Sequence, residues 1–251
     1  MPLKDKAEYH VPIPNKFARI LLRPMARTVF RFLSVLTFTG LENIPPRGPY
    51  IVALNHISLF DAPFIVAFWP SELEAMIASD VWSRKGQNVI INLYYGIQVH
   101  RSEFDRTLID KVLAVLESGK PILIAPEGTR SHKPGMQRAF PGIGYIIEKA
   151  QVPVVPVGIT GAFDDFLDKA IHFKHPRLEM HIGKPIYLPV NTAKGEERRK
   201  QRQQTADTVM VKIGELLPPE YRGVYRDFQL PITRDEGNLY QEIAPPKGAL
   251  L

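Results

Sequence analysis

The sequence of 251 residues contains no cysteine. This absence excludes disulfide bonds, thiolate metal sites and a cysteine nucleophile, and it suits a reducing compartment. Long apolar runs are also missing: the cleanest uncharged stretches, residues 32–41 and 86–99, are shorter than the roughly 20 residues that a transmembrane helix needs. Arginines are spread through the first apolar stretch instead of preceding it, which argues against a signal peptide. We therefore expect a globular chain without a membrane-spanning helix.

The formal net charge of +6 is concentrated near the N-terminus. Residues 1–48 hold eight lysines and arginines but only three acids, a balance of +5. The basic residues recur every three or four positions, at 16, 19, 23, 27 and 31. This spacing gathers them in one stripe along a helix.

A basic amphipathic helix rich in phenylalanine and leucine is typical of a segment that lies in a membrane interface. We therefore expect residues 1–40 to form a membrane-associating element that binds anionic lipids, with Pro24 kinking or splitting the helix. The expected location is peripheral or monotopic, on the cytoplasmic face of a membrane. The alternative is a surface helix that docks on the core and leaves its arginines in water. No recognition module accompanies the stripe, so we expect no nucleic-acid partner.

The rest of the chain alternates short apolar runs with segments of helical length. We expect strands at 50–54, 74–79, 97–99, 121–125, 152–159, 178–182 and 185–188, and helices at 62–69, 106–119, 142–151 and 196–217. Residues 82–93 fit either a helix or a loop, and 161–168 read as a loop. Such alternation predicts an α/β domain over residues 41–217, with a central, mostly parallel or mixed sheet flanked by helices. Residues 218–251, rich in proline and aromatics, are expected to form a C-terminal tail that acts as a lid or a strap, or that is partly disordered.

The heptapeptide 55–61, Asn-His-Ile-Ser-Leu-Phe-Asp, falls where a strand ends and a helix begins, a common position for chemistry in α/β proteins. On one continuous helix, positions 56 and 61 would point about 140° apart, so His56 must lie in the turn before it. Either Ser58 is the N-cap with Asp61 at N3, or Asp61 itself is the cap. A carboxylate there can bind one imidazole nitrogen and leave the other as a general base. The competing interpretation is that Asp61 only caps the helix.

A second polar loop, residues 126–131 (Pro-Glu-Gly-Thr-Arg-Ser), follows the apolar run 121–125. The carboxyl ends of parallel strands share one edge of a sheet. His56, Arg101 and this loop should therefore converge. An arginine at such an edge suits a phosphate, which its planar fork binds in bidentate fashion.

Two other chemistries do not fit the sequence. Ser58 is not in a Gly-x-Ser-x-Gly elbow, which argues against a hydrolase nucleophile. The three histidines His172, His175 and His181 have no cysteine or clear carboxylate partner with ligand spacing, so we expect no metal site.

Four ordered blocks of the sequence resemble those of the glycerolipid acyltransferases, and the nearest type is the bacterial 1-acylglycerol-3-phosphate acyltransferase. The blocks are Asn55-His56-x-Ser58-x-x-Asp61, Gly96-x-x-x-x-Arg101, the loop 126–131, and Val152-Pro153-Val154-Val155-Pro156-Val157. The resemblance implies a glycerol-3-phosphate acyltransferase-like fold. It also implies transfer of a fatty acyl group from acyl-CoA or acyl-carrier protein to the free hydroxyl of lysophosphatidate, giving phosphatidate at a membrane surface.

By this resemblance, His56 is the general base and Asp61 its orienting partner. The residues implied to bind the acceptor are Asn55, Ser58, Arg101, Glu127, Gly128, Thr129 and Arg130. The substrate's own hydroxyl is then the nucleophile, so neither a covalent enzyme intermediate nor a resident cofactor is required, and the acyl carrier is a co-substrate. Backbone N–H groups near Gly128 or at the helix start are candidates for binding the oxyanion.

The chain departs from the family after the third block. Many members have a Phe-Lys-x-Gly element there, and Phe140 occupies the position of its lysine, for which Arg138 or Lys133 is a candidate substitute. The alternative function is therefore an acyltransferase or transacylase of the same family with another acceptor, such as glycerol phosphate, a lysophospholipid or an aminolipid. A non-catalytic membrane-binding protein is a further alternative, against which the intact His56 and Asp61 argue.

Overall fold

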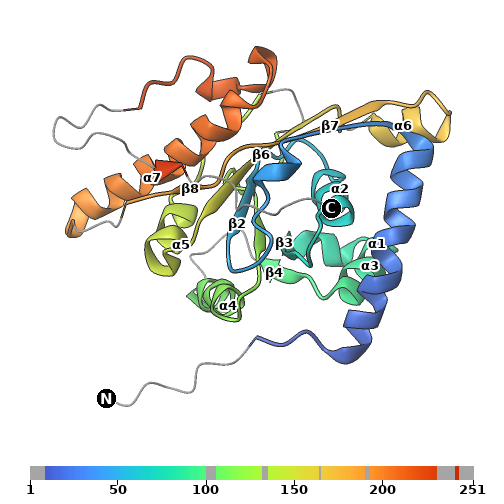
Figure 1. Ribbon diagram of the computed structural model, residues 1–251, viewed down its shortest axis with the longest axis horizontal. Coiled ribbons are helices and arrows are strands. Elements are labelled where there is room, and N and C mark those ends of the chain that lie inside the picture. The colour runs from blue at the N-terminus through green and yellow to red at the C-terminus, as the bar shows by residue number, and fades with distance from the viewer. Residues whose placement is uncertain are drawn as a thin grey trace.

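The structure is a computed structural model that describes residues 9–99, 106–131, 135–163, 165–189, 193–230 and 241–242 (Figure 1). Its helices are α1 (Ile13–Leu33), α2 (Asp61–Phe68), α3 (Gln87–Tyr94), α4 (Arg106–Glu117), α5 (Gly142–Ala150), α6 (Phe166–Ile171) and α7 (Gly195–Glu215). Short 3-10 helices are η1 (Leu41–Asn43), η2 (Ser79–Ser83), η3 (Pro219–Tyr221) and η4 (Gly223–Tyr225). The strands are β1 (Val35–Thr39), β2 (Ile51–Leu54), β3 (Glu74–Ala78), β4 (Ile97–Val99), β5 (Ile122–Ile124), β6 (Val154–Thr160), β7 (Arg177–Ile182), β8 (Ile186–Tyr187) and β9 (Gln241–Glu242).

These strands form one mixed sheet in the order β1-β7-β6-β2-β5-β3-β4, with β8 beside β6 and β9 beside β8. The pairs β1–β7, β6–β2, β2–β5, β5–β3 and β3–β4 are parallel. β7 and β8 run antiparallel to β6, and β9 runs antiparallel to β8. The predicted α/β class with a mixed sheet is confirmed. The parallel run from β6 to β4 brings the carboxyl ends of five strands to one edge.

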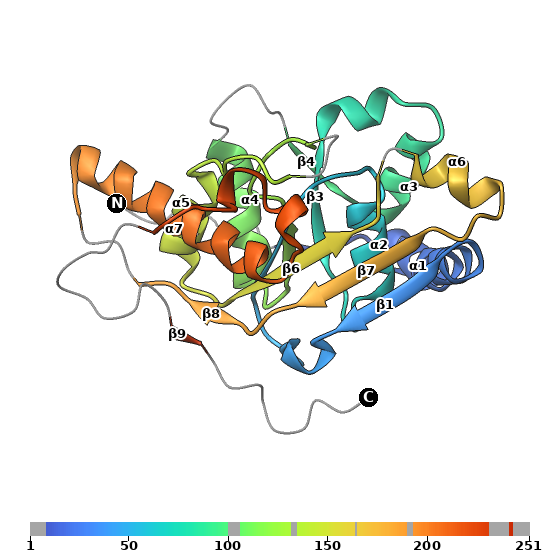
Figure 2. The same ribbon diagram turned by 90° about the horizontal axis from the view of Figure 1, so that it is seen from above.

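The helices cover this sheet in two groups (Figures 1 and 2). On one side, α4 packs on α5 and α5 on α7, and α7 lies against β2 and β6. On the other side, α1 packs on α2 and α3 and also touches β1. The central strands are therefore shielded on both faces.

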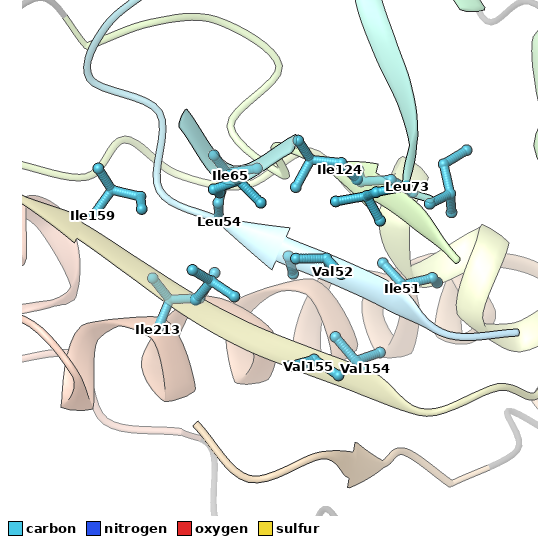
Figure 3. Close-up of a cluster of buried hydrophobic side chains, with 14 of the residues drawn as sticks. Ile51, Val52, Leu54, Ile65, Leu73, Ile124, Val154, Val155, Ile159 and Ile213 are labelled. Carbon is cyan, nitrogen blue, oxygen red and sulfur yellow. The ribbon is translucent and has the colours of Figure 1, made fainter. Parts of the chain in front are cut away.

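Every residue of β2 and β6 is buried, as expected for central strands covered on both faces. Figure 3 shows the resulting core, to which several elements contribute Ile51, Val52, Leu54, Ile65, Leu73, Ile124, Val154, Val155, Ile159 and Ile213. Burying each such side chain contributes roughly 1.5–3 kcal/mol to the free energy of folding. This well-packed centre fixes the edge from which the polar loops project.

Most predicted elements are present, and three features differ from the expectation. The helix expected within residues 1–40 ends at Leu33, and β1 follows it as a strand of the sheet. α6 replaces part of the loop expected at 161–168, while residues 82–93 contain the end of η2 and most of α3. Pro24 lies inside α1 without splitting it.

Three of the five basic residues in the stripe of α1, Arg19, Arg23 and Arg27, face the protein, which neither interpretation of this helix anticipated. Arg19 is only 1% exposed. Its Nη1 and Nη2 donate to the two carboxylate oxygens of Glu74 at 2.8 and 2.6 Å, and its Nε donates to the carbonyl of Tyr94 at 2.8 Å. Arg23 and Arg27 donate to backbone carbonyls at the C-terminal end of α2. The arginines thus attach α1 to the α/β domain.

The opposite side of α1 is apolar and exposed. It carries Ile13, Phe17, Ile20, Leu21, Met25, Val29 and Phe32. Exposed apolar residues of α3 (Val89, Ile90, Leu93) and in and after α6 (Leu167, Ile171, Phe173) lie beside it, and the rings of Phe32 and Phe173 are 5.9 Å apart. We call these residues together the apolar face. Clustered exposed apolar side chains mark interaction surfaces.

None of the helices in the described ranges is both long and apolar enough to cross a bilayer.

Residues 218–230, which we expected to begin a separate tail, pack in part against the loop after β5. Tyr221 and Tyr225 are buried, and the N–H of Met136 donates to the carbonyl of Tyr221 at 3.0 Å. Gly223 has φ +51°, and a Cβ there would lie 2.2 Å from the carbonyl oxygen of Met136. Glycine is thus required for this close approach, through which the segment straps the loop.

Candidate active site

Asn55, the first residue after β2, ties the heptapeptide loop to the sheet. Its side chain is fully buried. Nδ2 donates to the carbonyl of Ile159 at 3.0 Å, and Oδ1 accepts the N–H of Ile159 at 2.7 Å. Both ends of the amide are thus engaged inside the protein. The side chain therefore joins the heptapeptide loop to β6, and the substrate contact expected for Asn55 stays a prediction.

The carboxylate of Asp61 turns back into the loop and binds the imidazole of His56. The distance from Nδ1 of His56 to Oδ2 of Asp61 is 2.9 Å. The same oxygen accepts the backbone N–H groups of Ile57 and Ser58, both at 2.8 Å. Asp61 is the first residue of α2 and Phe60 is the N-cap, so neither expected helix start is the observed one. Because Nδ1 is held by the carboxylate, Nε2 of His56 is the nitrogen left to act as a base.

Burial sets the electrostatics of this pair. Asp61 is fully buried, which raises the pKa of its carboxyl against the opposing hydrogen bond and charge of His56. Its Oδ1 has no hydrogen-bond partner among the described residues, whereas the imidazole is 18% exposed. The exposed edge of His56 is therefore the side at which another group can approach the imidazole.

Ser58 shapes the turn before α2. It is 1% exposed, and its Oγ accepts the N–H of Phe60 at 3.1 Å. The substrate contact expected for Ser58 stays a prediction. The backbone N–H groups of Ile57, Ser58 and Gly128 are all engaged within the protein, so an oxyanion would need other donors.

The second polar loop leaves β5 and turns sharply at Gly128. This residue has φ +67°, a left-handed conformation that glycine adopts readily. Its N–H donates to the carbonyl of Ala125 at 3.0 Å, and a Cβ would lie 2.9 Å from the ring of Phe140. Thr129 and Arg130 follow the turn and are half-buried.

Glu127 joins the two loops from inside. It is 1% exposed. Its Oε1 accepts the N–H of His56 at 2.8 Å, and its Oε2 accepts the N–H of Gln137 at 2.7 Å. Burial raises the pKa of Glu127 to about 7; the charge of Asp61 adds to this rise, and the two N–H groups oppose it. Glu127 thus braces the two loops against each other, and the acceptor contact expected for it stays a prediction.

The convergence of the two loops, predicted from the parallel sheet, is confirmed. The N–H of Ser131 donates to the carbonyl of His56 at 2.9 Å. Because Glu127 binds the N–H of the same residue, the second loop holds both backbone polar groups of His56. Arg101, the third expected member, lies outside the described residues, although β4 before it ends at this edge.

Behind the second loop, α7 and η4 supply supports that the sequence pattern did not reveal. Asp207 of α7 is 3% exposed and accepts the hydroxyl of Tyr225 at 2.7 Å and the Nε2 of Gln203 at 3.0 Å. The same hydroxyl accepts the N–H of Ala139 at 3.0 Å. An acid inside a long charged helix gives no sequence signal of burial, and Tyr225, whose hydroxyl it accepts, lies 18 positions further along the chain.

Phe140 lies where the family has a lysine. Its N–H donates to the carbonyl of Pro126 at 2.9 Å, its ring lies against Gly128, and it is 59% exposed. Of the two candidate substitutes, Arg138 pairs with Asp207 at 3.3 Å, and Lys133 lies outside the described residues. An aromatic ring therefore covers this part of the loop.

Two of the three histidines considered as metal ligands have other partners. Nδ1 of His181 is 2.8 Å from Oγ1 of Thr39, and Nδ1 of His172 is 2.8 Å from the carbonyl of Asp168. Within the described ranges, no three histidine, aspartate or glutamate side chains are grouped to hold a metal ion.

The chain is similar in sequence to known proteins. At 23% identity over 150 residues, the chain resembles 1-acyl-sn-glycerol-3-phosphate acyltransferase alpha of Ovis aries, with 59% of this chain and 52% of the relative covered. The enzyme of the same name from Homo sapiens is 22% identical over 150 residues, with 59% and 53% covered. The matches thus span about half the length of these curated relatives.

The fold has a counterpart among solved structures. The crystal structure of the 1-acyl-sn-glycerophosphate (LPA) acyltransferase PlsC from Thermotoga maritima superimposes with a TM-score of 0.56 at 23% identity. The superposition covers 76% of this chain and 78% of that one. A family model described as Acyltransferase matches residues 35–160, just over half of the chain and a range that includes both polar loops. The chain therefore belongs to the Acyltransferase family.

Proposed function

We propose that this chain transfers a fatty acyl group from acyl-CoA or acyl-carrier protein to the free hydroxyl of lysophosphatidate, giving phosphatidate. The observation that carries the proposal is the bond of 2.9 Å between His56 and Asp61, which leaves one imidazole nitrogen for the acceptor hydroxyl. The names of the relatives, which are 1-acyl-sn-glycerol-3-phosphate acyltransferases, support the same acceptor class.

The proposed chemistry is direct attack. Nε2 of His56 removes the proton of the acceptor hydroxyl while the hydroxyl oxygen forms a bond to the thioester carbonyl carbon. The tetrahedral intermediate collapses, the C–S bond breaks, and the leaving thiolate takes the proton back from His56. One thioester becomes one ester and one free thiol. Asp61 stabilises the imidazolium between the two proton transfers.

Thr129 and Arg130 are the proposed contacts of the acceptor's phosphate. Both lie on the loop that holds the backbone of His56 on two sides, which would keep phosphate and base at a fixed separation. A guanidinium group matches the geometry of a phosphate. Arg101 is the second proposed phosphate ligand, on the strength of the family resemblance alone.

The apolar face is proposed to hold the enzyme on the cytoplasmic surface of a membrane, where a lysophospholipid resides. Helices with one exposed apolar side bind such interfaces by burying that side among the acyl chains. α1 packs directly on α2, and α2 begins with Asp61. The proposed lipid contact and the catalytic pair are therefore linked through a single helix.

The catalytic proposal is tested with purified protein in detergent, labelled palmitoyl-CoA and a panel of acceptors. The panel contains lysophosphatidate, glycerol 3-phosphate, other lysophospholipids and an aminolipid. His56→Ala is compared with wild type and with His172→Ala, a matched change at an exposed histidine. We expect labelled phosphatidate from wild type and from His172→Ala, and none from His56→Ala.

Two results would contradict the proposal in different ways. If lysophosphatidate gains no label while another acceptor does, the acceptor is wrong and the reaction type stands. If His56→Ala keeps the wild-type rate on any acceptor, the mechanism is wrong.

The exposed ring of Phe140 favours a second candidate acceptor. A lysine at that position would add a cation for a phosphate monoester, whereas the observed ring lies beside Gly128 of the loop. A less charged lysophospholipid would suit this surface better. In the same panel, Phe140→Lys is expected to shift the ratio of kcat/KM values toward lysophosphatidate, and an unchanged ratio would exclude a role for this position.

Membrane association is tested by flotation with phosphatidylcholine vesicles. Leu21→Glu places a charge on the apolar face at a side chain that is 72% exposed, and Val224→Glu makes the same change at an exposed position of η4. Loss of a buried leucine contact corresponds to a decrease of about tenfold or more in vesicle binding. We expect that loss for Leu21→Glu alone; equal binding of the two variants would rule out the apolar face.

A further inference from the structure

A pocket of about 250 Å³ lies between α1 and the segment after α2, outside the site described above. Its lining residues are Arg19, Ile20, Arg23, Pro24, Arg27 and Glu72. The volume lies below the roughly 300–1,000 Å³ typical of pockets for drug-sized ligands. It suits a small charged group better than an acyl chain.

Two of the arginines bring charge to this pocket without a carboxylate partner. Arg23 donates through Nε to the carbonyl of Val66 at 3.2 Å and through Nη2 to the carbonyl of Trp69. Arg27 donates through Nε to the carbonyl of Ala67. These acceptors are neutral, and among the described residues no carboxylate lies within ion-pair distance of either arginine. The remaining guanidinium N–H groups are available for an anion.

The balance of charge around the pocket is positive. Arg19 is matched by the buried carboxylate of Glu74. Glu72, 42% exposed and 3.7 Å from Arg19, is the one acid in the lining. Burial is the largest cause that lowers the pKa of Arg23, and the charges of Arg27 and Arg19 also lower it. An anion bound between Arg23 and Arg27 would offset that repulsion.

We propose that Arg23 and Arg27 bind the phosphate of an acidic membrane phospholipid in this pocket. Residues four positions apart lie on the same side of a helix, so the two guanidinium groups can share one phosphate, which each can bind in bidentate fashion. A choline headgroup would bring a second cation beside the arginines and fits less well. An acidic headgroup has no such conflict.

The position of the pocket favours a lipid as the source of the phosphate. Ile20 and Pro24, which form part of its wall, are exposed, and Ile20 belongs to the apolar face. If that face is buried among acyl chains, the rim of the pocket lies at the depth of the headgroups. The inference therefore rests on the membrane association proposed above.

This phospholipid is distinct from the acyl acceptor. The catalytic pair is at the first residue of α2, and the arginines bind carbonyls at its C-terminal end, about 10 Å away along the helix axis. A lipid phosphate there would neutralise the two arginines that hold the far end of α2. The pocket would act as a docking site for a second lipid.

The test is co-sedimentation of the full chain with vesicles of phosphatidylcholine alone and of phosphatidylcholine with phosphatidate. The variants are Arg23→Gln and Arg27→Gln, with Arg31→Gln as a matched loss of charge on the same helix outside the pocket. We expect the two pocket variants to bind acidic vesicles at least tenfold more weakly than wild type and to bind neutral vesicles equally well. Arg31→Gln is expected to lose only the few-fold that diffuse attraction by one surface charge contributes.

A variant with the opposite effect guards against simple misfolding. Glu72→Gln removes the acid of the pocket and leaves the contacts with α2 intact, so it is expected to strengthen binding to acidic vesicles severalfold. Asp168→Asn, at an exposed acid of α6, should change binding less. Equal losses for Arg23→Gln and Arg31→Gln, or no gain for Glu72→Gln, would overturn this inference alone. A wild-type protein that binds neither kind of vesicle would overturn the apolar face as well.

Discussion

The carboxylate of Glu127 accepts the backbone N–H of His56 at 2.8 Å. A buried acid of the second polar loop thus holds the backbone of the histidine in the first. Its second oxygen accepts the N–H of Gln137 at 2.7 Å. The position of the imidazole thus depends on a side chain that is 1% exposed.

This acid should make stability depend on pH. The pKa of Glu127 is about 7 in the folded protein against an ordinary value of 4.5. Between these values the folded protein binds a proton that the unfolded chain has released. The free energy of unfolding should therefore fall as pH rises from about 4.5 to about 7, by about 3 kcal/mol, and then level off. Urea titrations of wild type and Glu127→Gln across this range measure the difference, and parallel pH profiles for the two proteins would contradict it.

Asp61→Asn should reduce kcat strongly while the protein stays folded. The amide keeps the shape of the side chain, but it cannot stabilise the imidazolium as a carboxylate does and can present a donor to Nδ1 of His56. The equivalent change in a histidine–aspartate pair costs about 10⁴-fold in kcat, so we expect a loss of about 10³- to 10⁴-fold. Initial rates are compared with circular dichroism of the same samples; a folded variant with near-normal kcat would show that the carboxylate has no catalytic part.

The buried pair of Arg19 and Glu74 should be strongly coupled. Burial alone would raise the pKa of Glu74, but hydrogen bonds and charge from Arg19, with help from Tyr9 and Lys120, lower it overall. Breaking such a pair leaves one buried charge uncompensated, at a cost of about 3–5 kcal/mol. We expect that loss for Arg19→Met, and a double variant with Glu74→Leu that loses less than the sum of the single changes.

An exposed ion pair provides the control for this double-mutant comparison. Lys169 and Asp165 are 2.6 Å apart with both side chains about half exposed, and exposed pairs contribute at most about 1 kcal/mol. Lys169→Met should therefore change the unfolding free energy little. Similar costs at the two sites would mean that Arg19 does not anchor α1.

Comparing Gly128 with Gly119 separates the cost of backbone strain at positive φ from the cost of a steric clash with a neighbouring side chain. Both residues are left-handed, at +67° and +80°, but a Cβ meets Phe140 at Gly128 and nothing within 4 Å at Gly119. Gly119→Ala should cost about 1–2 kcal/mol for the backbone alone, and Gly128→Ala more. Adding Phe140→Ala to Gly128→Ala should return the cost toward that of Gly119→Ala, as measured by urea unfolding. An unchanged cost would show that the ring yields without strain.

The sequence was sufficient for the convergence of the two polar loops, because apolar runs such as 50–54 and 121–125 identify strands and parallel strands share an edge. It was not sufficient for the hydrogen-bond partners of Asn55 and Glu127. Both are polar residues of the two loops that contain the proposed site, but their partners are backbone groups brought near only by the fold.

The orientation of α1 could not be read from its periodicity. Spacing shows which residues share a face of a helix, but not which face meets the protein. That choice depends on Glu74, 55 positions beyond Arg19 in the chain, and on carbonyls at the end of α2. β1 was missed for a similar reason, since its partner β7 begins only at Arg177.

The orientation of α1, with arginines toward the protein and apolar side chains toward the solvent, also affects how the protein behaves in water. A formal charge of +6 would ordinarily keep copies of a protein apart through mutual repulsion. Here much of the cationic part of α1 is directed inward, and hydrocarbon side chains point toward the solvent. Without lipid or detergent, colliding copies would associate through the exposed apolar side of α1. The isoelectric point alone therefore does not indicate the colloidal stability of this protein.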